Sequence, residues 1–166
     1  MRRLRGPESR CGEQKTSAID PGCAVYLFLF RDGQVLMLRR HNTGFEDGSY
    51  SVIAGHVERD ERITQALVRE ALEEASVRLY EEDIRFLHVM QRTNPYGLIY
   101  VDFFFAAERW QGEVLNREPS KCDDLRWFRL TDLPENTIPY VREVLMNHWV
   151  NQSSFSEYGW GTLYQR

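Results

Sequence analysis

Three glutamates, Glu70, Glu73 and Glu74, stand close together in the segment REALEE. At about 100° per residue, a helix over residues 63–75 places them on one arc that is about 100° wide. The apolar residues of the same segment fall on a separate arc; they are Leu67, Val68, Ala71, Leu72 and Ala75. The segment therefore predicts a helix that buries one face and concentrates carboxylates on the other.

Such a concentration of carboxylates has a free-energy cost. Glu70 and Glu74 are like charges at i, i+4, which destabilises a helix by roughly 0.2–0.5 kcal/mol, and confined carboxylates raise one another's pKa. A hard divalent cation removes the repulsion, and Mg²⁺ typically uses few carboxylates together with waters and substrate phosphates. The alternative, a solvated acidic helix face, is the commoner origin of such a cluster, so the wider spacing of the chain has to decide.

That wider spacing begins at a glycine upstream of the helix. Gly55 is followed after five residues by Glu61 and after seven more by Arg69-Glu70, and the segment closes with Ala71, Glu73-Glu74 and Val77. The pattern resembles the signature of the Nudix hydrolases, GX5EX7REUXEEXGU. One position departs from it, because Ser76 stands where the family has glycine. Serine in the left-handed conformation that ends many helices should cost about 1 kcal/mol of stability, and its presence removes no metal ligand.

The resemblance implies an enzyme that uses Mg²⁺, or Mn²⁺, to hydrolyse the diphosphate linkage of a nucleoside diphosphate joined to another group. By the same resemblance the metal ligands are Glu70, Glu73, Glu74 and the carbonyl of Gly55. Glu70 is also the expected general base, although the base varies within the family. Arg69 is expected to orient the carboxylates and to pair with Glu61.

Further site residues are expected outside the signature. The segment around Glu118 is similar to one in MutT-type enzymes, where a downstream carboxylate completes the metal site; a solvated loop carboxylate is the alternative. Arg39 or Arg40, at the end of a predicted strand, matches the place of a phosphate-binding arginine, and Arg40 aligns better, against the alternative of a surface arginine. Tyr140, near the start of the last predicted helix, is expected to reach the nucleobase.

Substrate markers of other branches of the family are missing. Gln91 replaces a proline typical of ADP-ribose enzymes, Arg92 replaces a tyrosine typical of dinucleoside polyphosphate enzymes, and the SQPWPFPXS run of NADH enzymes is absent. These differences favour a nucleoside triphosphate, or a modified one, cleaved to monophosphate and pyrophosphate. The alternatives are an ADP-ribose or other nucleotide-sugar pyrophosphatase, or a non-catalytic nucleotide-sensing Nudix module.

The elements that must position these residues follow from the apolar patterns. Strands are predicted over residues 23–30, 34–39, 51–54, 86–90, 98–107 and 125–130. Asp32-Gly33 predicts a hairpin turn, Asp60 is a suitable N-cap for the acidic helix, and helical spacing predicts a closing helix over residues 138–150. Strands on both sides of a helix indicate a mixed β-sheet between helices. This α/β fold agrees with the α/β/α sandwich that the Nudix resemblance implies.

The resemblance covers residues 19–151 and leaves two ends outside it. Residues 1–18 are charged, lack an apolar stretch and are interpreted as a mobile N-terminal arm. Residues 152–166 form an aromatic-bearing C-terminal tail that could fold back on the domain, pack in a dimer or be mobile.

Composition limits the partners and the location. The formal net charge of −4 over 166 residues gives no basic footprint, so we expect a nucleotide substrate and no nucleic acid. No apolar stretch reaches the ~18 residues of a membrane span. The three cysteines, Cys11, Cys23 and Cys122, show no metal-site spacing and are expected to be free thiols in a reducing cytoplasm. The sequence leaves open whether the protein is a monomer or a homodimer.

Overall fold

Strand β1 (Gly22–Arg31) lies inside an eight-stranded sheet in the computed structural model, which describes residues 20–150 and 153–162. It pairs in parallel with β6 (Ile99–Ala107) and antiparallel with β4 (Ile53–His56) and β2 (Gln34–Arg40). The strand order is β3-β2-β1-β6-β5-β8, and β7 pairs with β2; the remaining strands are β3 (Tyr50–Ser51), β5 (Arg85–Thr93), β7 (Cys122–Arg129) and β8 (Phe155–Tyr158). The predicted mixed sheet is confirmed.

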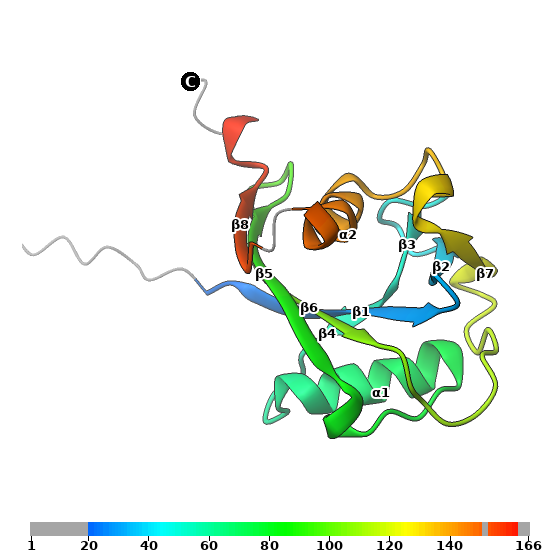
Figure 1. Ribbon diagram of the computed structural model, residues 1–166. Helices are drawn as coiled ribbons and strands as arrows, with labels where there is room; N and C mark the ends of the chain where they lie inside the picture. Colours follow the sequence, from blue (N-terminus) through cyan, green and yellow to red (C-terminus); the bar gives the residue numbers. More distant parts are fainter. Residues whose placement is uncertain (1–19, 151–152, 163–166) are drawn as a thin grey trace, which may run out of the picture.

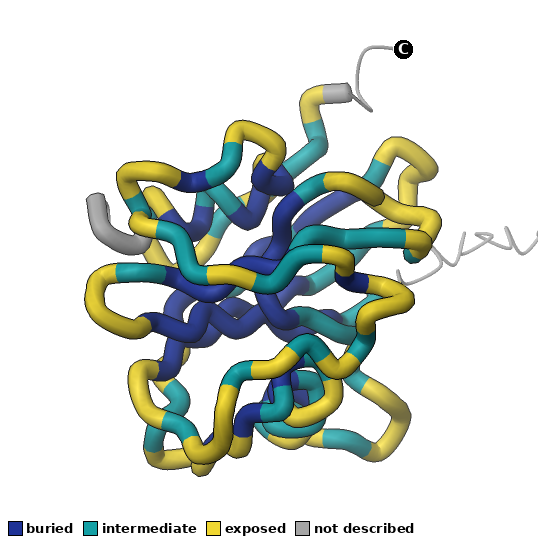
Figure 2. Tube along the Cα trace, turned by 90° about the vertical axis from the view of Figure 1, so that its right-hand side faces the viewer, coloured by how far each residue is buried: buried dark blue, intermediate teal, exposed yellow. Residues whose placement is uncertain are grey.

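Two helices cover the two faces of this sheet (Figure 1). Helix α1 (Ile63–Ala75) packs on one face and α2 (Pro139–Val150) on the other. Short 3-10 helices η1 (Glu81–Asp83) and η2 (Leu130–Asp132) lie in the connections, and η3 (Trp160–Thr162) follows the last strand. Because side chains alternate along a strand, β1 supplies both cores. Its residues Val25, Leu27 and Leu29 pack in the cluster with α1, while Tyr26 and Phe28 pack in the cluster with α2. Figure 2 shows the buried strands between exposed loops, so the α/β/α sandwich is confirmed.

The two ends of α1 differ in how well the sequence predicted them. The N-cap is Arg62, not Asp60, whose φ of 65° is incompatible with the extended backbone that an N-cap residue adopts. The backbone N–H of Arg62 instead donates to the side chain of Gln65 at 3.0 Å. At the other end Ser76 has a φ of 62° and takes the left-handed conformation predicted for it. Leu72 was expected on the buried arc but is 43% exposed, because it lies at the edge of that arc.

The C-terminal segment folds back on the sheet over the part that the structure describes. Strand β8 pairs in parallel with β5. The buried His88 of β5 holds the C-terminal segment against the sheet. Its Nδ1 lies 2.8 Å from the Ser153 carbonyl oxygen, and its Nε2 lies 2.7 Å from the Ser156 hydroxyl. The predicted arm of residues 1–18 lies outside the described residues.

Two further findings concern sequence expectations. Within residues 20–150 and 153–162, no helix combines the length and the apolar character needed to cross a membrane. Cys23 and Cys122 are free thiols, and Cys11 lies outside the described residues.

Candidate active site

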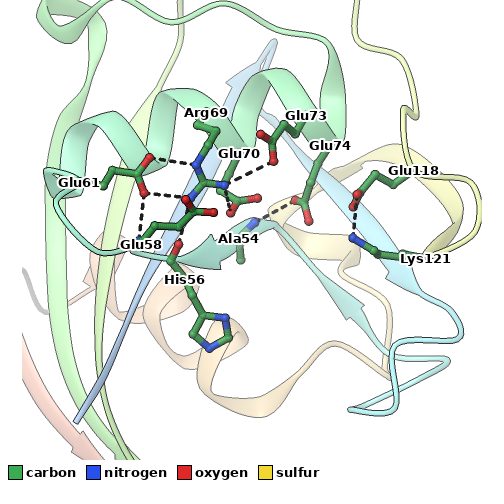
Figure 3. Close-up of polar contacts among 10 residues, drawn as sticks. All are labelled: Ala54, His56, Glu58, Glu61, Arg69, Glu70, Glu73, Glu74, Glu118 and Lys121. Atoms are coloured by element: carbon green, nitrogen blue, oxygen red, sulfur yellow. Dashed lines mark hydrogen bonds and ion pairs between the residues drawn. The ribbon is translucent and has the colours of Figure 1, made fainter. Parts of the chain in front are cut away.

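The guanidinium of Arg69 organises the acidic side of the site (Figure 3). Its Nε and Nη2 donate to the two carboxylate oxygens of Glu61 at 2.9 and 3.0 Å, a bidentate pair. Nη2 also donates to the backbone carbonyl of His56 at 3.0 Å, which ties α1 to the end of β4. The arginine lowers the pKa of the Glu61 carboxyl through this hydrogen bonding. Arg69 and Glu61 are therefore paired as the sequence predicted.

Glu70 lies directly against the strand that carries Gly55. Its Oε1 accepts a hydrogen bond from Nη1 of Arg69 at 2.6 Å. A Cβ atom on Gly55 would lie 1.8 Å from the same oxygen, which no side chain permits. Glycine is thus required here for close approach rather than for an unusual backbone angle. Burial raises the pKa of the Glu70 carboxyl, against the opposing effect of Arg69.

Glu74 is the last glutamate of the helical cluster and lies against β4. Its Oε2 accepts a hydrogen bond from the Ala54 backbone N–H at 3.0 Å, and no cationic side chain of the described residues forms an ion pair with it. Burial raises its pKa to about 8, and the nearby charges of Glu70 and Glu118 act in the same direction. By contrast Glu73, one residue earlier, has a 54% exposed side chain and lies 3.4 Å from Nη1 of Arg69. The site thus holds a buried carboxyl group without a fixed counter-charge.

Glu118 comes from the loop before β7 and lies on the same side of the site. Its Oε1 accepts a hydrogen bond from Lys121 Nζ at 2.7 Å. Its charge contributes to the raised pKa values of both Glu70 and Glu74, so the three carboxyl groups are electrostatically close. Glu118 therefore lines the same cavity as the glutamates of α1.

A cavity of about 730 Å³ connects these residues to the sheet and to α2. Gly55, Glu70, Glu73, Glu74 and Glu118 all line it. Its other walls carry side chains from β1, β2, β4, β5, β6, α2 and the loops after β2 and before β7; among them are Tyr26, Arg40, Thr43, Phe45, His56, Arg92, Tyr100, Lys121 and Tyr140. A cavity of this size is in the range of small-molecule sites.

The chemistry of this donor set suits a hard divalent cation. Carboxylate oxygens and a glycine carbonyl are the ligands that Mg²⁺ accepts, with waters and phosphates completing its shell. As the side chains stand, no three carboxylates, imidazoles or thiols of the described residues are arranged to hold a metal ion. Glu70 is instead paired with Arg69, and Glu118 with Lys121. A cation here would therefore compete with two protein cations for the same carboxylates.

The structure separates the two arginines that the sequence left as alternatives. Arg40 lines the cavity, and its guanidinium donates to the Phe45 carbonyl at 2.7 Å and to the Thr43 hydroxyl at 3.1 Å. Arg39 does not reach the cavity, because its Nε and Nη2 pair with Asp123 at 2.7 and 3.1 Å. Consecutive residues of a strand point to opposite faces, which accounts for the difference.

The cavity wall near α2 holds Tyr140 together with a charged pair to which the sequence analysis gave no role. Tyr140 lines the cavity, and its hydroxyl lies 3.2 Å from that of Tyr26. Next to it, Arg92 of β5 pairs with Asp102 of β6 at 2.6 Å, and both are buried. The signal that could have found this pair is Asp102 itself, a single charge inside the apolar run of residues 98–107, since a buried charge needs a partner.

Comparison with known proteins agrees with this fold. The chain belongs to the NUDIX domain family, whose profile matches residues 20–148. The chain is similar to the crystal structure of a MutT NUDIX hydrolase from Burkholderia pseudomallei, with a TM-score of 0.71 and 27% identity over 76% of this chain and 97% of that one. The solution structure of the E. coli ORF135 protein shares the fold at a TM-score of 0.63 and 23% identity, over 77% of this chain and 88% of that one.

Curated relatives share about a third of their aligned residues with this chain. A protein named NAD-capped RNA hydrolase NudC from Pectobacterium carotovorum is 31% identical over 125 residues, which are 75% of this chain and 44% of that protein. The protein of the same name from Stutzerimonas stutzeri is 32% identical over 124 residues, 75% of this chain and 41% of that protein. The chain thus spans less than half the length of these relatives.

Proposed function

We propose that the protein hydrolyses the diphosphate linkage of a nucleoside diphosphate joined to another group, with Mg²⁺ or Mn²⁺ as cofactor. The observation that carries the proposal is Glu74, a buried carboxyl group that lacks a fixed counter-charge and shares one cavity with Glu70, Glu73 and Glu118. Such a group is stabilised in its charged form when a cation enters the cavity.

In this proposal the carbonyl of Gly55 and the carboxylates of Glu73, Glu74 and Glu118 hold the cation, with Glu70 as a further ligand or as the base. The bound ion supplies Lewis-acid polarisation of the phosphoryl oxygens and lowers the pKa of water. Arg69 keeps Glu70 in place, and Glu61 acts as a positioning residue through Arg69.

Glu70 is our choice for the general base. Its raised pKa brings it closer to neutral pH, where a base is most effective. It takes a proton from the attacking water while the water oxygen bonds to one phosphorus. The bridging P–O bond then breaks, and the other phosphate leaves with the bonding electron pair. Arg40, on the cavity wall, is placed to bind the phosphate chain, and Tyr140 to line the nucleoside end.

The first candidate substrate is a nucleoside triphosphate, or a modified one, cleaved to monophosphate and pyrophosphate. It rests on the missing markers for ADP-ribose, dinucleoside polyphosphate and NADH enzymes. A second candidate, a pyridine dinucleotide or a transcript that carries one, is favoured by the names of the curated relatives. The expectation that no nucleic acid takes part stays a prediction, as do the cytoplasmic location and the choice between monomer and homodimer.

A panel of substrates with and without Mg²⁺ tests the proposal. Nucleoside triphosphates, ADP-ribose, a nucleotide sugar, NADH and a NAD-capped transcript would be incubated with the protein and with Glu74→Gln, and the phosphate products separated. We expect pyrophosphate release that requires Mg²⁺ and is lost in Glu74→Gln. Turnover of ADP-ribose alone would replace the triphosphate assignment. Binding without turnover of any compound would favour the nucleotide-sensing module.

A further inference from the structure

A second charged group lines the same cavity, on the face of the sheet that α2 covers. Arg92 is 6% exposed, and its Nε donates to Asp102 at 2.6 Å, with a longer contact of 3.5 Å from Nη2. Asp102 is fully buried. The guanidinium carbon lies 4.6 Å from the ring centre of Tyr100 and 4.5 Å from that of Tyr140. Arg92 is thus held in one orientation by an ion pair and two aromatic rings.

One nitrogen of this guanidinium is left without a partner. No hydrogen bond of the described residues involves Nη1 of Arg92, and Arg92 lines the cavity. Tyr100 and Tyr140 line it too. Nη1 is not one of the buried atoms that lack a partner among the described residues, so it keeps access to the cavity that Arg92 lines. An arginine held in one orientation, with a free NH₂ group open to a ligand cavity, is therefore placed to donate hydrogen bonds to the ligand.

The charge balance of the pair selects a neutral partner. Asp102 already compensates the charge of Arg92, so a phosphate at Nη1 would add an uncompensated anion to a buried site, which is unfavourable. A carbonyl oxygen or a ring nitrogen meets the free N–H groups without that cost. The planar rings of Tyr100 and Tyr140 on the same wall suit a flat, uncharged partner.

We propose that Arg92, held by Asp102, Tyr100 and Tyr140, is the specificity-determining residue for the nucleobase and selects guanine over adenine. This inference rests on the proposed function only in taking the substrate to be a nucleotide. Guanine presents two adjacent acceptors, O6 and N7, to an arginine. Adenine carries an amino group where guanine has O6. This amino group is a hydrogen-bond donor, so it cannot accept a hydrogen bond from Arg92.

The first test measures the base preference of the unmodified protein. Values of kcat/KM would be compared for GTP, ITP, 7-deaza-GTP and ATP at saturating Mg²⁺. ITP retains both acceptors and should be within about threefold of GTP, whereas 7-deaza-GTP lacks N7 and should fall by about tenfold, the effect of one hydrogen bond to a charged donor. ATP should fall by at least about tenfold. 8-oxo-GTP, which carries hydrogen at N7, should fall with 7-deaza-GTP.

A double variant tests the residue itself. Replacing Arg92 alone would leave Asp102 buried and unpaired, which can prevent folding, so Arg92→Gln is combined with Asp102→Asn to keep a neutral hydrogen-bonding pair. We expect the ratio of kcat/KM for GTP to that for ATP to fall toward one. The matched control is Arg62→Gln with Glu81→Gln, an exposed arginine–carboxylate pair on the helix side, which should keep the original ratio.

The outcomes separate this inference from the proposed function. Equal turnover of GTP and ATP by the unmodified protein, or a parallel loss of both in the double variant, overturns the role of Arg92 and leaves the hydrolase intact. If no nucleotide is turned over, the proposed function fails, and calorimetric binding decides the base instead. Tighter binding of GTP than of ATP, lost in the double variant, supports the inference, and equal or absent binding overturns it.

Discussion

At the scale of single residues, the contact between Gly55 and Glu70 gives the sharpest prediction. A methyl group at Gly55 would lie 1.8 Å from the Glu70 carboxylate. Because that carboxylate is the far end of a flexible side chain, Gly55→Ala should displace it without unfolding the protein. We expect kcat to fall by at least about 100-fold, the usual contribution of a positioned acid or base. Circular dichroism would verify the fold.

Gly161→Ala is the matched control for this substitution, since an added Cβ there meets no atom within 4 Å. It should retain the original kcat. Full activity of Gly55→Ala would show that the position of Glu70 does not matter for the reaction.

The raised pKa of Glu74 predicts how stability depends on pH in the metal-free protein. The folded state keeps the proton up to about pH 8, whereas the unfolded chain loses it near the ordinary glutamate pKa. The protonated side chain therefore favours folding at low pH, and this contribution is lost as the pH rises toward 8. Glu74→Gln should be more stable than the original protein at pH 8, by on the order of 3 kcal/mol, and about equally stable at pH 4.5.

Urea unfolding at these two pH values, in the presence of a chelator, would measure the difference. A stability gap between the two proteins that stays constant from pH 4.5 to 8 would contradict the buried, protonated state of Glu74.

The same proton links metal binding to pH. A cation can only use Glu74 after the proton has left, so binding at pH values below about 8 releases one proton at this residue. The apparent association constant for Mg²⁺ should rise up to about tenfold per pH unit between pH 6 and 8 and then level off. Titrations in buffers of different ionisation enthalpy would count the protons released. Binding that is independent of pH would exclude Glu74 as a ligand.

At the scale of elements, the C-terminal end of α1 is strained where the Nudix signature has glycine. Ser76 has a φ of 62°, and its N–H lies 3.2 Å from the Leu72 carbonyl. Glycine adopts this conformation without strain, so Ser76→Gly should raise the free energy of unfolding by about 1 kcal/mol. Ser76→Ala keeps the strain and should stay within about 0.5 kcal/mol of the original protein. A loss of stability in Ser76→Gly would contradict this account of the helix end.

Elements with a local signal were predictable from the sequence, and those fixed by distant contacts were not. The helical period over residues 63–75 and the turn at Asp32-Gly33 depend on neighbouring residues, and both predictions are confirmed. Strand β8 depends on pairing with β5, far away in the chain, and nothing in its sequence distinguishes that pairing from a mobile tail. The N-cap prediction was wrong because Asp60 takes part in the turn before the helix with a positive φ.

At the scale of the whole molecule, one half of the site could be predicted from the sequence and the other half could not. Gly55, Glu61, Arg69, Glu70 and Glu74 lie within one continuous stretch, so their spacing alone indicated a common site, and the structure places them together. The other half of the cavity is assembled by sheet pairing. Its residues come from strands and a helix distributed over the chain; they are Tyr26, Arg40, Arg92, Tyr100 and Tyr140. Asp102 holds Arg92 through their ion pair.

The C-terminal segment lies beside this half of the cavity. Tyr158 of β8 lies opposite Arg92 in the sheet register and packs against Tyr140 with ring centres 5.8 Å apart. The strand that carries Arg92 is thus flanked in the sheet by the last described strand. Strand β8 lies beyond the match to the NUDIX family, which ends at residue 148.

The most direct test of the central claim is calorimetric titration of Mg²⁺ into the protein in the presence of a non-hydrolysable nucleotide triphosphate. If the carboxylates of this cavity hold the cation against the nucleotide phosphates, binding should be measurable in the original protein. It should weaken by at least about tenfold in Glu74→Gln, since a ligand is lost, and be unchanged in Glu82→Gln, whose side chain is exposed on η1. No heat of binding in the original protein, or equal affinity in Glu74→Gln, would contradict the account.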